Sequence, residues 1–302
     1  MELTSRFFWL HCLSPLHIGS GEGIGVIDMP IQREKVTEWP MIPGSSLKGV
    51  HRDYYRLNGK NEAWINKAFG QAGDQDGAAG ALVMTDGRIL AFPVASRYGT
   101  FAYVTCPLVL KRLRRDAQAA GLAMDIPDLE VFESETAGAD EVWVSESSVI
   151  RSGEKEKLNI FLDEFEGKAS VSTSFTKWAI TISNYLFEDA PSRELWTERL
   201  ALVSDEVFQY FTTMCCEVTP RIRINEDTKT TVKGALWYEE YVPTEAVFYG
   251  LIWCDRVGGS FELQARNQLL EELEDSTLIL QLGGNTTIGK GRTRFLISGG
   301  CV

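Results

Sequence analysis

The chain has 302 residues, of which 44% are hydrophobic and 24% charged, as in ordinary globular domains. No apolar run reaches 18 residues, which excludes a membrane-spanning helix, and the opening MELTSRFFWLHC lacks the features of a signal peptide, so we expect a cytoplasmic protein. Six scattered cysteines without a CxxC pair predict reduced, packed thiols rather than a disulfide framework or a zinc site.

The net charge of −12 argues against a phosphate-bearing partner until its distribution is considered. Residues 125–168 carry −9, and residues 188–206 and 262–275 carry −4 each, which leaves +5 on the rest of the chain. The acidity is therefore segregated, and the remaining basic part of the chain is compatible with nucleic-acid binding.

The first part of the chain alternates apolar runs with turn signals. We predict, in order, a strand at 5–13, a glycine-rich loop at 19–30, a helix at 46–58 capped by Ser45 or Ser46, and a short helix at 61–69. The dipeptide Asp86-Gly87 lies between two apolar runs and predicts a hairpin turn. A strand at 101–106 and a helix beginning at Pro107 follow.

The second part begins with residues 122–170, which are acidic and irregular and indicate a surface insertion. We then predict an amphipathic helix at 192–214, a long hairpin with a polar tip at 218–243, a buried strand at 246–254, a helix at 262–275 and a strand at 292–298. This order favours a single α+β domain over residues 1–302, with one antiparallel sheet, helices on one face, and insertions.

Two glycine-rich segments invite comparison with nucleotide-binding loops. In Gly19–Gly25 the glycines are spaced by two, which does not match the dinucleotide fingerprint, and no helix is predicted to follow. The segment GNTTIGKG nearly matches a P-loop, but Gly291 replaces the hydroxyl residue and a strand follows. We reject both motifs; the second segment, with Lys290 and Arg292, suits contact with a phosphate chain.

A basic stripe follows the predicted helix after the PGSS turn. Lys48, Arg52, Arg56 and Lys60 recur every four residues, so at least the first three share one helix face, and Ser45 and Ser46 lie where backbone N–H groups are free. No acidic residue lies four positions after these basic residues to pair with them. This pattern favours a helix face that binds a polyanion over one that is merely exposed to solvent. Arg221 and Arg223 on the predicted hairpin alternate with aromatic residues, a pattern that suits single-stranded nucleic acid or one packed aromatic face.

Candidate catalytic groups are few because the chain has three histidines. His11 lies in an apolar strand and is expected to be a core residue, whereas His17 opens the glycine loop that ends at Asp28. A histidine can transfer protons near neutral pH, and an acid can orient a nucleophile or hold a metal. From the residues alone, Asp28 is equally well explained as a turn cap, and Glu239 and Glu240 as strand charges.

The run SPLHIGSGEGIGVIDMPIQRE, followed by IPGSSLKGVHR, resembles the repeated backbone subunits of type III-B CRISPR (Cmr) RNA-guided effector complexes, which belong to the RAMP superfamily. Three further blocks agree, in the same order: ILAFPVASRYGTFAYVTCPLVLKRLRRD, RIRINEDTKTTVKGALWYEEYVPTEAVFYGLI and LQLGGNTTIGKGRTRF. Together they cover somewhat under half of the chain. The acidic stretch 125–168 carries no family signature.

The resemblance implies a modified ferredoxin-like (RRM-like) core, with a lid-type insertion at 122–170 and a protruding thumb hairpin at 218–243. It implies copies stacked in a helical filament on a CRISPR guide RNA, contacts with other Cmr-type subunits, and endonucleolytic cleavage of complementary target RNA with a divalent metal, Mg²⁺ or Mn²⁺. Asp28 is then the catalytic residue and a candidate metal ligand, and His17, Glu239 and Tyr241 match the family's other functional positions. The expected RNA-binding residues are Lys48, Arg52, Arg56, Ser45, Ser46, Arg221, Arg223, Lys290 and Arg292.

Two alternatives remain open at this point. In the first alternative, the chain would be a scaffold that binds guide RNA without cutting. In the second, it would be a stand-alone guide-processing endonuclease that uses His17. In either case the basic stripe would hold the RNA backbone without reading its sequence.

Overall fold

The computed structural model describes residues 5–21, 23, 25–71, 79–133, 138, 140–153, 158–255, 263–274 and 277–298, and every count below refers to these ranges. The strands of the main sheet are β1 (Ser5–Cys12), β2 (Met41–Ile42), β3 (Leu82–Met84), β4 (Gly87–Ala95), β5 (Phe101–Thr105), β6 (Glu141–Val144), β7 (Arg151–Ser152), β8 (Asn159–Leu162), β9 (Phe165–Val171), β10 (Leu200–Leu202), β13 (Val247–Cys254), β14 (Leu278–Gln281) and β15 (Arg292–Ser298). A separate hairpin consists of β11 (Glu217–Ile224) and β12 (Thr231–Tyr241). The helices are α1 (Gly44–Leu57), α2 (Glu62–Phe69), α3 (Pro107–Ala119), α4 (Thr173–Leu186), α5 (Ala190–Arg199), α6 (Asp205–Met214) and α7 (Leu263–Glu274), with a 3₁₀ turn at Thr286–Ile288.

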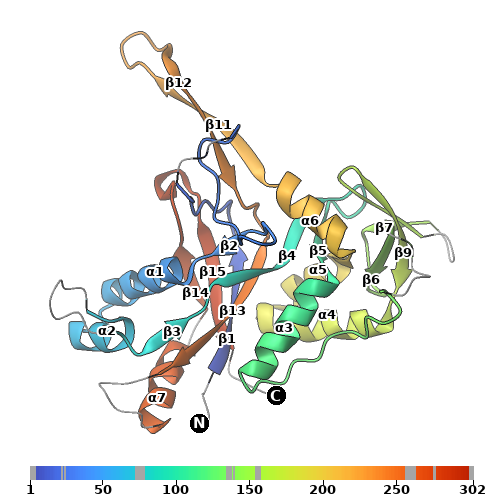
Figure 1. Ribbon diagram of the computed structural model, residues 1–302, viewed down its shortest axis with the longest axis horizontal. Helices are drawn as coiled ribbons and strands as arrows, with labels where there is room; N and C mark the ends of the chain where they lie inside the picture. The colour runs from blue at the N-terminus through green and yellow to red at the C-terminus, as the bar shows by residue number, and fades with distance from the viewer. Residues whose placement is uncertain are drawn as a thin grey trace.

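Four antiparallel strands form the centre of the fold in the order β15-β1-β13-β4 (Figure 1). Among these four strands, β1 is first in the chain, β4 second, β13 third and β15 fourth, so the spatial order is 4-1-3-2. Helix α1 lies between the first and second, and α7 between the third and fourth. This βαββαβ order is the ferredoxin-like arrangement, so the predicted fold class is confirmed.

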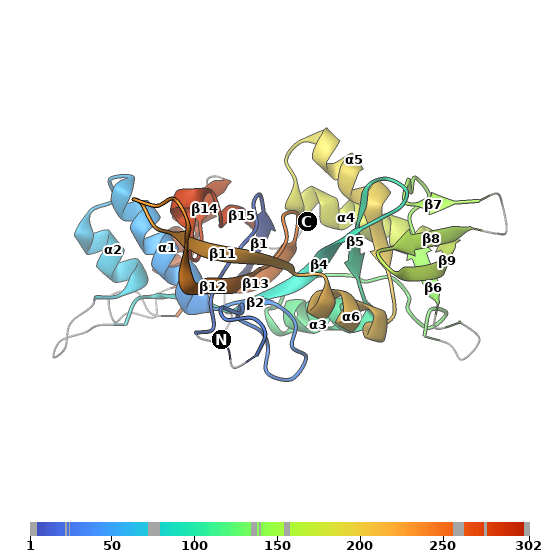
Figure 2. The same ribbon diagram turned by 90° about the horizontal axis from the view of Figure 1, so that it is seen from above.

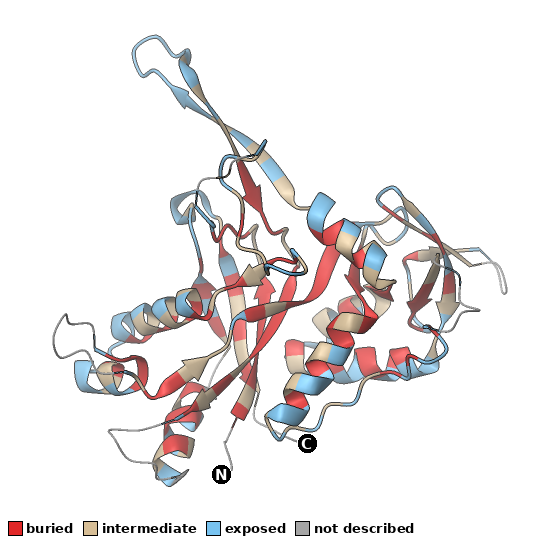
Figure 3. Ribbon diagram, in the orientation of Figure 1, coloured by how far each residue is buried: buried red, intermediate tan, exposed pale blue. Residues whose placement is uncertain are grey.

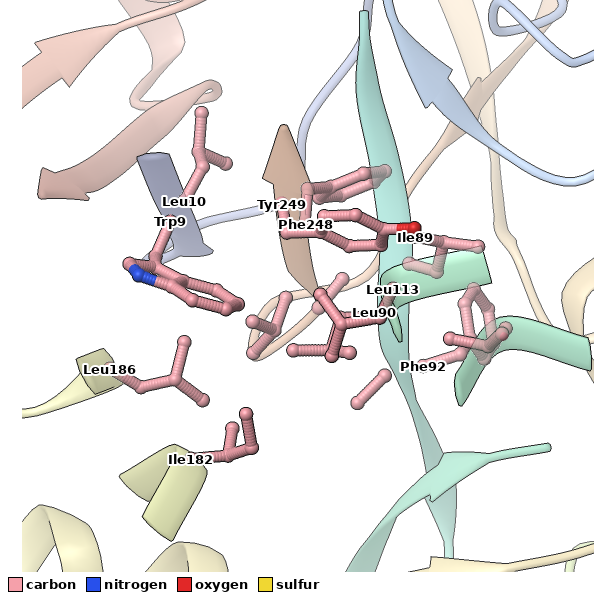
Figure 4. Packing of buried hydrophobic residues seen from close by; sticks show 14 of the residues in the cluster. Trp9, Leu10, Ile89, Leu90, Phe92, Leu113, Ile182, Leu186, Phe248 and Tyr249 are labelled. Atoms are coloured by element: carbon pink, nitrogen blue, oxygen red, sulfur yellow. The ribbon is translucent and has the colours of Figure 1, made fainter. Parts of the chain in front are cut away.

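The two faces of these strands are covered by different helices. Phe8 and Leu10 point to the face of α1, where the His51 ring packs edge-on against Phe295 at 4.3 Å. Figure 1 shows α1 and α7 on this side. The predicted single helical face is wrong, because inserted helices cover the other face, and the predicted purely antiparallel sheet is wrong because β10 runs parallel to β5 and β9 runs parallel to β6. Trp9 points the other way, toward Ile182 and Leu186 of α4 (Figure 4). It stacks on Tyr185 of the same helix, which belongs to the segment inserted between β4 and β13.

Several elements agree with the sequence predictions. The first strand, the short helix at 61–69, the strand at 101–106, the helix after Pro107, the long hairpin, the buried strand, the helix at 262–275 and the last strand are all present, within a few residues of the expected bounds. Five described cysteines are free, and Cys301 lies outside the described residues. No described helix has the length and apolar character needed to span a bilayer.

The hairpin predicted at Asp86-Gly87 is wrong. Both β3 and β4 run antiparallel to β13, one after the other along the same edge, so the dipeptide interrupts a strand rather than reversing it. The reason lies in what the turn residues bond: Thr85 exchanges hydrogen bonds with Leu251, and Asp86 Oδ1 accepts from Gly44 N at 2.8 Å.

This last contact also corrects the predicted cap of α1. The helix begins at Gly44, so Ser45 and Ser46 lie in its first turn, and neither provides a side-chain cap. Asp86, far away in the sequence, accepts the first helical N–H instead. Local sequence reasoning could not find a cap that comes from another strand.

The single helix predicted at 192–214 is divided in two. Leu200–Leu202 is fully buried and pairs in parallel with β5, so these apolar residues complete the sheet. Helix α6 then starts after Ser204, whose hydroxyl accepts from Val207 N, and has Asp205 in its first turn. Helix α6 is amphipathic and buries Phe208 and Phe211, whereas α5 is mostly polar and buries Trp196.

The irregular insertion predicted at 122–170 is wrong in its secondary structure. Strands β6, β9, β8 and β7 extend the main sheet, and Val142, Ile160 and Leu162 are buried in the hydrophobic core. Most acidic residues of this segment lie in the connections between the strands, and the strands themselves contain only Glu141 and Glu166, so the overall composition hid four short strands. The assignment of this segment as a lid stays a prediction. Helix α4, which follows it, was not anticipated from the sequence.

Candidate active site

The glycine loop of residues 16–31 is attached at both ends to the hairpin strand β12. Leu16 pairs with Val242, and Met29 pairs with Glu239. Met29 N donates to Tyr238 O and Glu240 N donates to Met29 O, both at 3.0 Å. The loop therefore projects from the base of the hairpin, which rises away from the rest of the molecule (Figures 1 and 2).

Asp28 lies at the end of this loop and is exposed. Its Oδ2 accepts a hydrogen bond from Tyr238 N at 2.7 Å, and its carbonyl accepts from Gly23 N at 2.8 Å. This side-chain contact is with β12 rather than with the loop's own backbone, so the turn-cap alternative does not describe it. A fixed backbone donor orients the carboxylate while the residue stays open to solvent.

His17 opens the same loop and is 4% exposed. Its Nδ1 lies 2.7 Å from Glu240 O, and since a carbonyl only accepts, Nδ1 carries the hydrogen. The ring also lies 5.5 Å from the Tyr241 ring. His17 and Asp28 therefore both bond to the backbone of β12, at residues 240 and 238, as expected for groups that share one site.

Glu239 and Tyr241 are joined on one face of β12. Tyr241 donates its hydroxyl hydrogen to Glu239 Oε2, which also accepts from Arg221 Nε at 3.0 Å. Asn285 Nδ2 lies 2.9 Å from the same oxygen and 2.8 Å from the Tyr241 hydroxyl, and Trp237 Nε1 donates to Glu239 Oε1 at 2.9 Å. Both carboxylate oxygens of Glu239 are thus occupied by donors.

The charge of Glu239 follows from these contacts. Burial acts to raise its pKa, but hydrogen bonds from Tyr241, Trp237 and Arg221 outweigh this and hold the pKa below its usual value. Burial, followed by the bond to Glu239, raises the pKa of the Tyr241 phenol. At neutral pH the pair is therefore a carboxylate and a neutral phenol, and it acts as a support for the cations beside it.

The second glycine-rich segment closes the site from the C-terminal side. Gly284 N donates to His17 O at 2.8 Å, and Lys290 Nζ lies 4.6 Å from the centre of the Tyr241 ring. Gly283 has φ +73°, and a Cβ there would come within 2.1 Å of His17 O, so glycine is required for this close approach. The segment continues into β15 and not into an α-helix, in agreement with the rejection of a P-loop.

The predicted RNA-binding residues fall into two groups. Arg221 and Lys290 belong to the cluster around Tyr241, with exposed Arg223 farther along β11 and exposed Arg292 at the start of β15. The others lie on α1, which packs against β14 and β3: Ser45, Ser46, Lys48, Arg52 and Arg56. Within the described residues, the side chains of Lys48 and Arg56 in this second group bond to partners other than Asp28.

The basic stripe of α1 is less free than its spacing suggested. Lys48 Nζ donates to Leu82 O at 2.8 Å, and burial lowers its pKa. Arg56 forms ion pairs with Glu62 and Asp53, and Lys60 pairs with Glu272. The sequence analysis considered only acids four positions after each basic residue, and these three acids lie at other positions. The assignment of the stripe to RNA stays a prediction.

Sequence reasoning missed two residues of the site. Glu240 was treated as a strand charge, although its carboxylate is buried and accepts from Arg33 and Ile31. Asn285, inside the near P-loop, adopts a left-handed conformation at φ 62°. A buried acid cannot be told from an exposed one in a strand of alternating charges, whereas the asparagine before Thr-Thr in a glycine turn was a usable signal.

A metal ion would find few protein ligands here. Among the described residues, no group of three His, Cys, Asp or Glu side chains is placed to hold one. Asp28 offers one exposed carboxylate, and Mg²⁺ is commonly held by one or two carboxylates together with substrate phosphates. The donor set therefore fits a metal bound mainly by its substrate.

The aromatic sheet face differs from that of RNA-binding proteins that stack bases on an open ferredoxin-like sheet. Phe7, Trp9 and Tyr249 share this face but are at most 4% exposed, because α3 and α4 cover it (Figure 3). Exposed polar and basic groups lie instead on the loop, the hairpin and the C-terminal glycine segment. The fold and these groups define a ferredoxin-like protein whose candidate site lies at the base of a projecting hairpin.

The chain belongs to the RAMP superfamily, whose family model matches residues 9–294. It is 37% identical over 287 residues to the "CRISPR system Cmr endoribonuclease Cmr4" of Pyrococcus furiosus, covering 93% of this chain and 92% of that protein. The crystal structure of oligomeric Cmr4 from the same organism superimposes with a TM-score of 0.71 at 29% identity, over 98% of both chains. A cryo-EM structure of Type III-B Cmr-beta bound to cognate target RNA, 21% identical over 98% of both chains, shares the fold with a TM-score of 0.75. These likenesses confirm the family resemblance.

Proposed function

We propose that this protein is a backbone subunit of a type III-B RNA-guided effector complex and that it cuts target RNA paired to the guide. The observation that carries this proposal is the placement of Asp28, an exposed carboxylate that Tyr238 N orients. Asp28 lies on a loop whose two ends are both attached to the base of the hairpin. Similarity along almost the whole chain to a protein named as an endoribonuclease supports the same activity.

The reaction that fits this site is attack of a ribose 2′-hydroxyl on the adjacent phosphate, which breaks the bond to the 5′-oxygen of the next nucleotide and leaves a 2′,3′-cyclic phosphate; the 2′-hydroxyl gives its proton to solvent and the 5′-oxygen takes one from solvent. Such a step depends on in-line geometry, which a nucleotide displaced from the duplex by the hairpin would reach. Asp28 would orient the attacking hydroxyl or hold a metal ion. His17, Glu239 and Tyr241 are buried, so we assign them to positioning the loop and the cations rather than to contact with RNA.

We also propose that cleavage requires Mg²⁺ or Mn²⁺. A bound ion would supply charge stabilisation at the scissile phosphate, with Asp28 as its protein ligand and phosphate oxygens as the remaining ones. Removal of divalent ions with a chelator is expected to stop cleavage and to leave guide RNA bound. Undiminished cleavage in the chelator would contradict a metal requirement without affecting the assignment of Asp28.

Guide RNA, further copies of this chain in a helical filament, and other Cmr-type subunits are the proposed partners. The exposed cations Arg223 and Arg292 and the half-buried Lys290 would contact phosphates without reading sequence.

The scaffold alternative is separated from the proposed function by comparing target cleavage in the wild type and in Asp28→Asn. Asp28→Asn keeps the size and the acceptor for Tyr238 N but removes the charge, so the complex should assemble on guide RNA and lose target cleavage. A scaffold would assemble and show no cleavage in the wild type either. Cleavage of precursor RNA by the isolated subunit would instead favour guide processing, and its absence would remove that alternative.

A further inference from the structure

Glu240 contacts both ends of the loop that carries Asp28. Its backbone N donates to Met29 O at 3.0 Å, and its carbonyl accepts from His17 Nδ1 at 2.7 Å. Its side chain accepts from Ile31 N at 3.0 Å and from Arg33 Nη2 at 2.6 Å. One residue of β12 thus fixes both the start of the loop and the segment directly after Asp28.

The carboxylate of Glu240 is held more firmly than a surface charge. Glu240 is 4% exposed, and the side chain of its partner Arg33 is 19% exposed. Arg33 also donates to Thr212 O at 3.0 Å and to Glu38 O at 2.6 Å, so its guanidinium is anchored to α6 and to the turn that follows the loop. A buried pair with satisfied donors gives the carboxylate a single position.

Backbone bonds from Ser20 N to Pro30 O at 3.0 Å and from Gly23 N to Asp28 O at 2.8 Å close the loop on itself, but its tip has few contacts with the rest of the protein. Gly21 has φ +103°, a Cβ at Gly21 or Gly25 would meet nothing within 4 Å, and Val26 is 87% exposed. A glycine-rich, unpacked segment samples many conformations. Ile31 is three residues from Asp28, so the bond from Ile31 N to Glu240 Oε2 is the nearest side-chain anchor on the C-terminal arm.

We propose that Glu240 is a positioning residue for cleavage: its carboxylate, placed by Arg33, holds Ile31 and thereby sets the position of Asp28 relative to the RNA. This inference rests on the proposed function, in which Asp28 acts on the scissile phosphate. Geometry rather than charge is the essential property, because the neutral backbone N–H of Ile31 is the group that must be reached.

Two substitutions separate geometry from charge. Glu240→Gln keeps the length and an acceptor for Ile31 N but loses the charge opposite Arg33. Glu240→Asp keeps the charge but withdraws the oxygens by one methylene, so one carboxylate cannot reach both Arg33 and Ile31 in their present places. Glu34→Asp is the matched control, because Glu34 lies just beyond the loop and pairs with Arg112, whose side chain is exposed to nearly the same extent as that of Arg33, 21% against 19%.

Each variant is assembled into the complex with guide RNA, and three quantities are measured: single-turnover cleavage at saturating target, target affinity, and thermal unfolding. We expect Glu240→Asp to slow cleavage by about 10- to 100-fold, with affinity changed less than about 2-fold, because small displacements of a reacting group have effects of this size. Glu240→Gln should lose more thermal stability than Glu240→Asp yet cleave within about 3-fold of wild type. Glu34→Asp should cleave at the wild-type rate.

The opposite order, with Glu240→Gln slow and Glu240→Asp normal, would overturn the inference and make Glu240 an electrostatic group. Rates that fall in parallel with stability in all three variants would also overturn it and leave a purely structural role. Asp28→Asn in the same assay separates this failure from failure of the proposed function: if Asp28→Asn cleaves normally, the site itself is wrong, whereas normal cleavage by Glu240→Asp alone rejects only the positioning role.

Discussion

The buried histidine of α1 makes stability depend on pH in a predictable range. His51 is 2% exposed, its Nδ1 donates to Leu47 O at 2.7 Å, and its Nε2 is buried without a hydrogen-bond partner among the described residues. Burial lowers the pKa of His51 to about 4, although the bond to Leu47 acts to raise it. The neutral ring is therefore the folded form at neutral pH.

The sign follows from proton binding. Between about pH 6.5 and pH 4 the unfolded chain binds a proton at this residue and the folded chain does not, so stability is full above pH 6.5 and is lost as the pH falls. Each pKa unit corresponds to about 1.4 kcal/mol, and over the range from pH 7.5 to pH 4 the loss from His51 alone is about 3 kcal/mol.

The assay compares urea unfolding of the wild type and of His51→Gln at a series of pH values. A glutamine can still donate to Leu47 O but does not titrate. We expect the variant to be less stable at pH 7.5 and the difference in unfolding free energy to shrink by about 3 kcal/mol by pH 4. A constant difference across this range would refute the argument, because it would mean that His51 titrates normally in the folded protein.

Two further predictions concern the C-terminal glycine segment and the cations. Gly283→Ala should lower the free energy of unfolding by about 1–3 kcal/mol more than its control, Gly289→Ala. Both glycines have positive φ, but only at Gly283 would a Cβ lie against His17 O. Equal losses in urea unfolding would contradict the close approach. Arg292 is an exposed cation without an ion pair among the described residues, so Arg292→Ala should reduce the slope of log affinity for RNA against log salt concentration by about 0.7. Arg56 is already paired with Glu62, so Arg56→Ala should change this slope less. Equal slopes for both variants would reject this distinction.

The sequence predicted elements best where one periodicity is uninterrupted. The strand at Ser5–Cys12, the long hairpin and the strand at Val247–Cys254 follow alternation or continuous apolar runs and were found within a few residues. The failures occur where a distant segment decides the local structure. Asp86-Gly87 is a normal hairpin signal, but β13 pairs with both flanking strands and the aspartate caps α1. Leu200–Leu202 fits a helix until β5 provides a partner.

The candidate site shows the same limit. The pattern of histidine, glycines and aspartate selects the loop, and the family resemblance selects Asp28 within it. Neither indicates that Tyr238 N orients Asp28 or that Arg33, Glu240 and Ile31 are joined beneath it, since these contacts link residues about 210 positions apart. Burial also changes the interpretation of Glu239, which looks like a free acid in the sequence and has both oxygens occupied in the structure.

The central claim is that Asp28 performs the cleavage step. The most direct test is single-turnover cutting of a guide-complementary RNA by the complex assembled with Asp28→Asn, with guide and target binding measured on the same preparation. The account predicts that both RNAs bind as in the wild type and that cleavage is abolished. Cleavage by Asp28→Asn at the wild-type rate would contradict it.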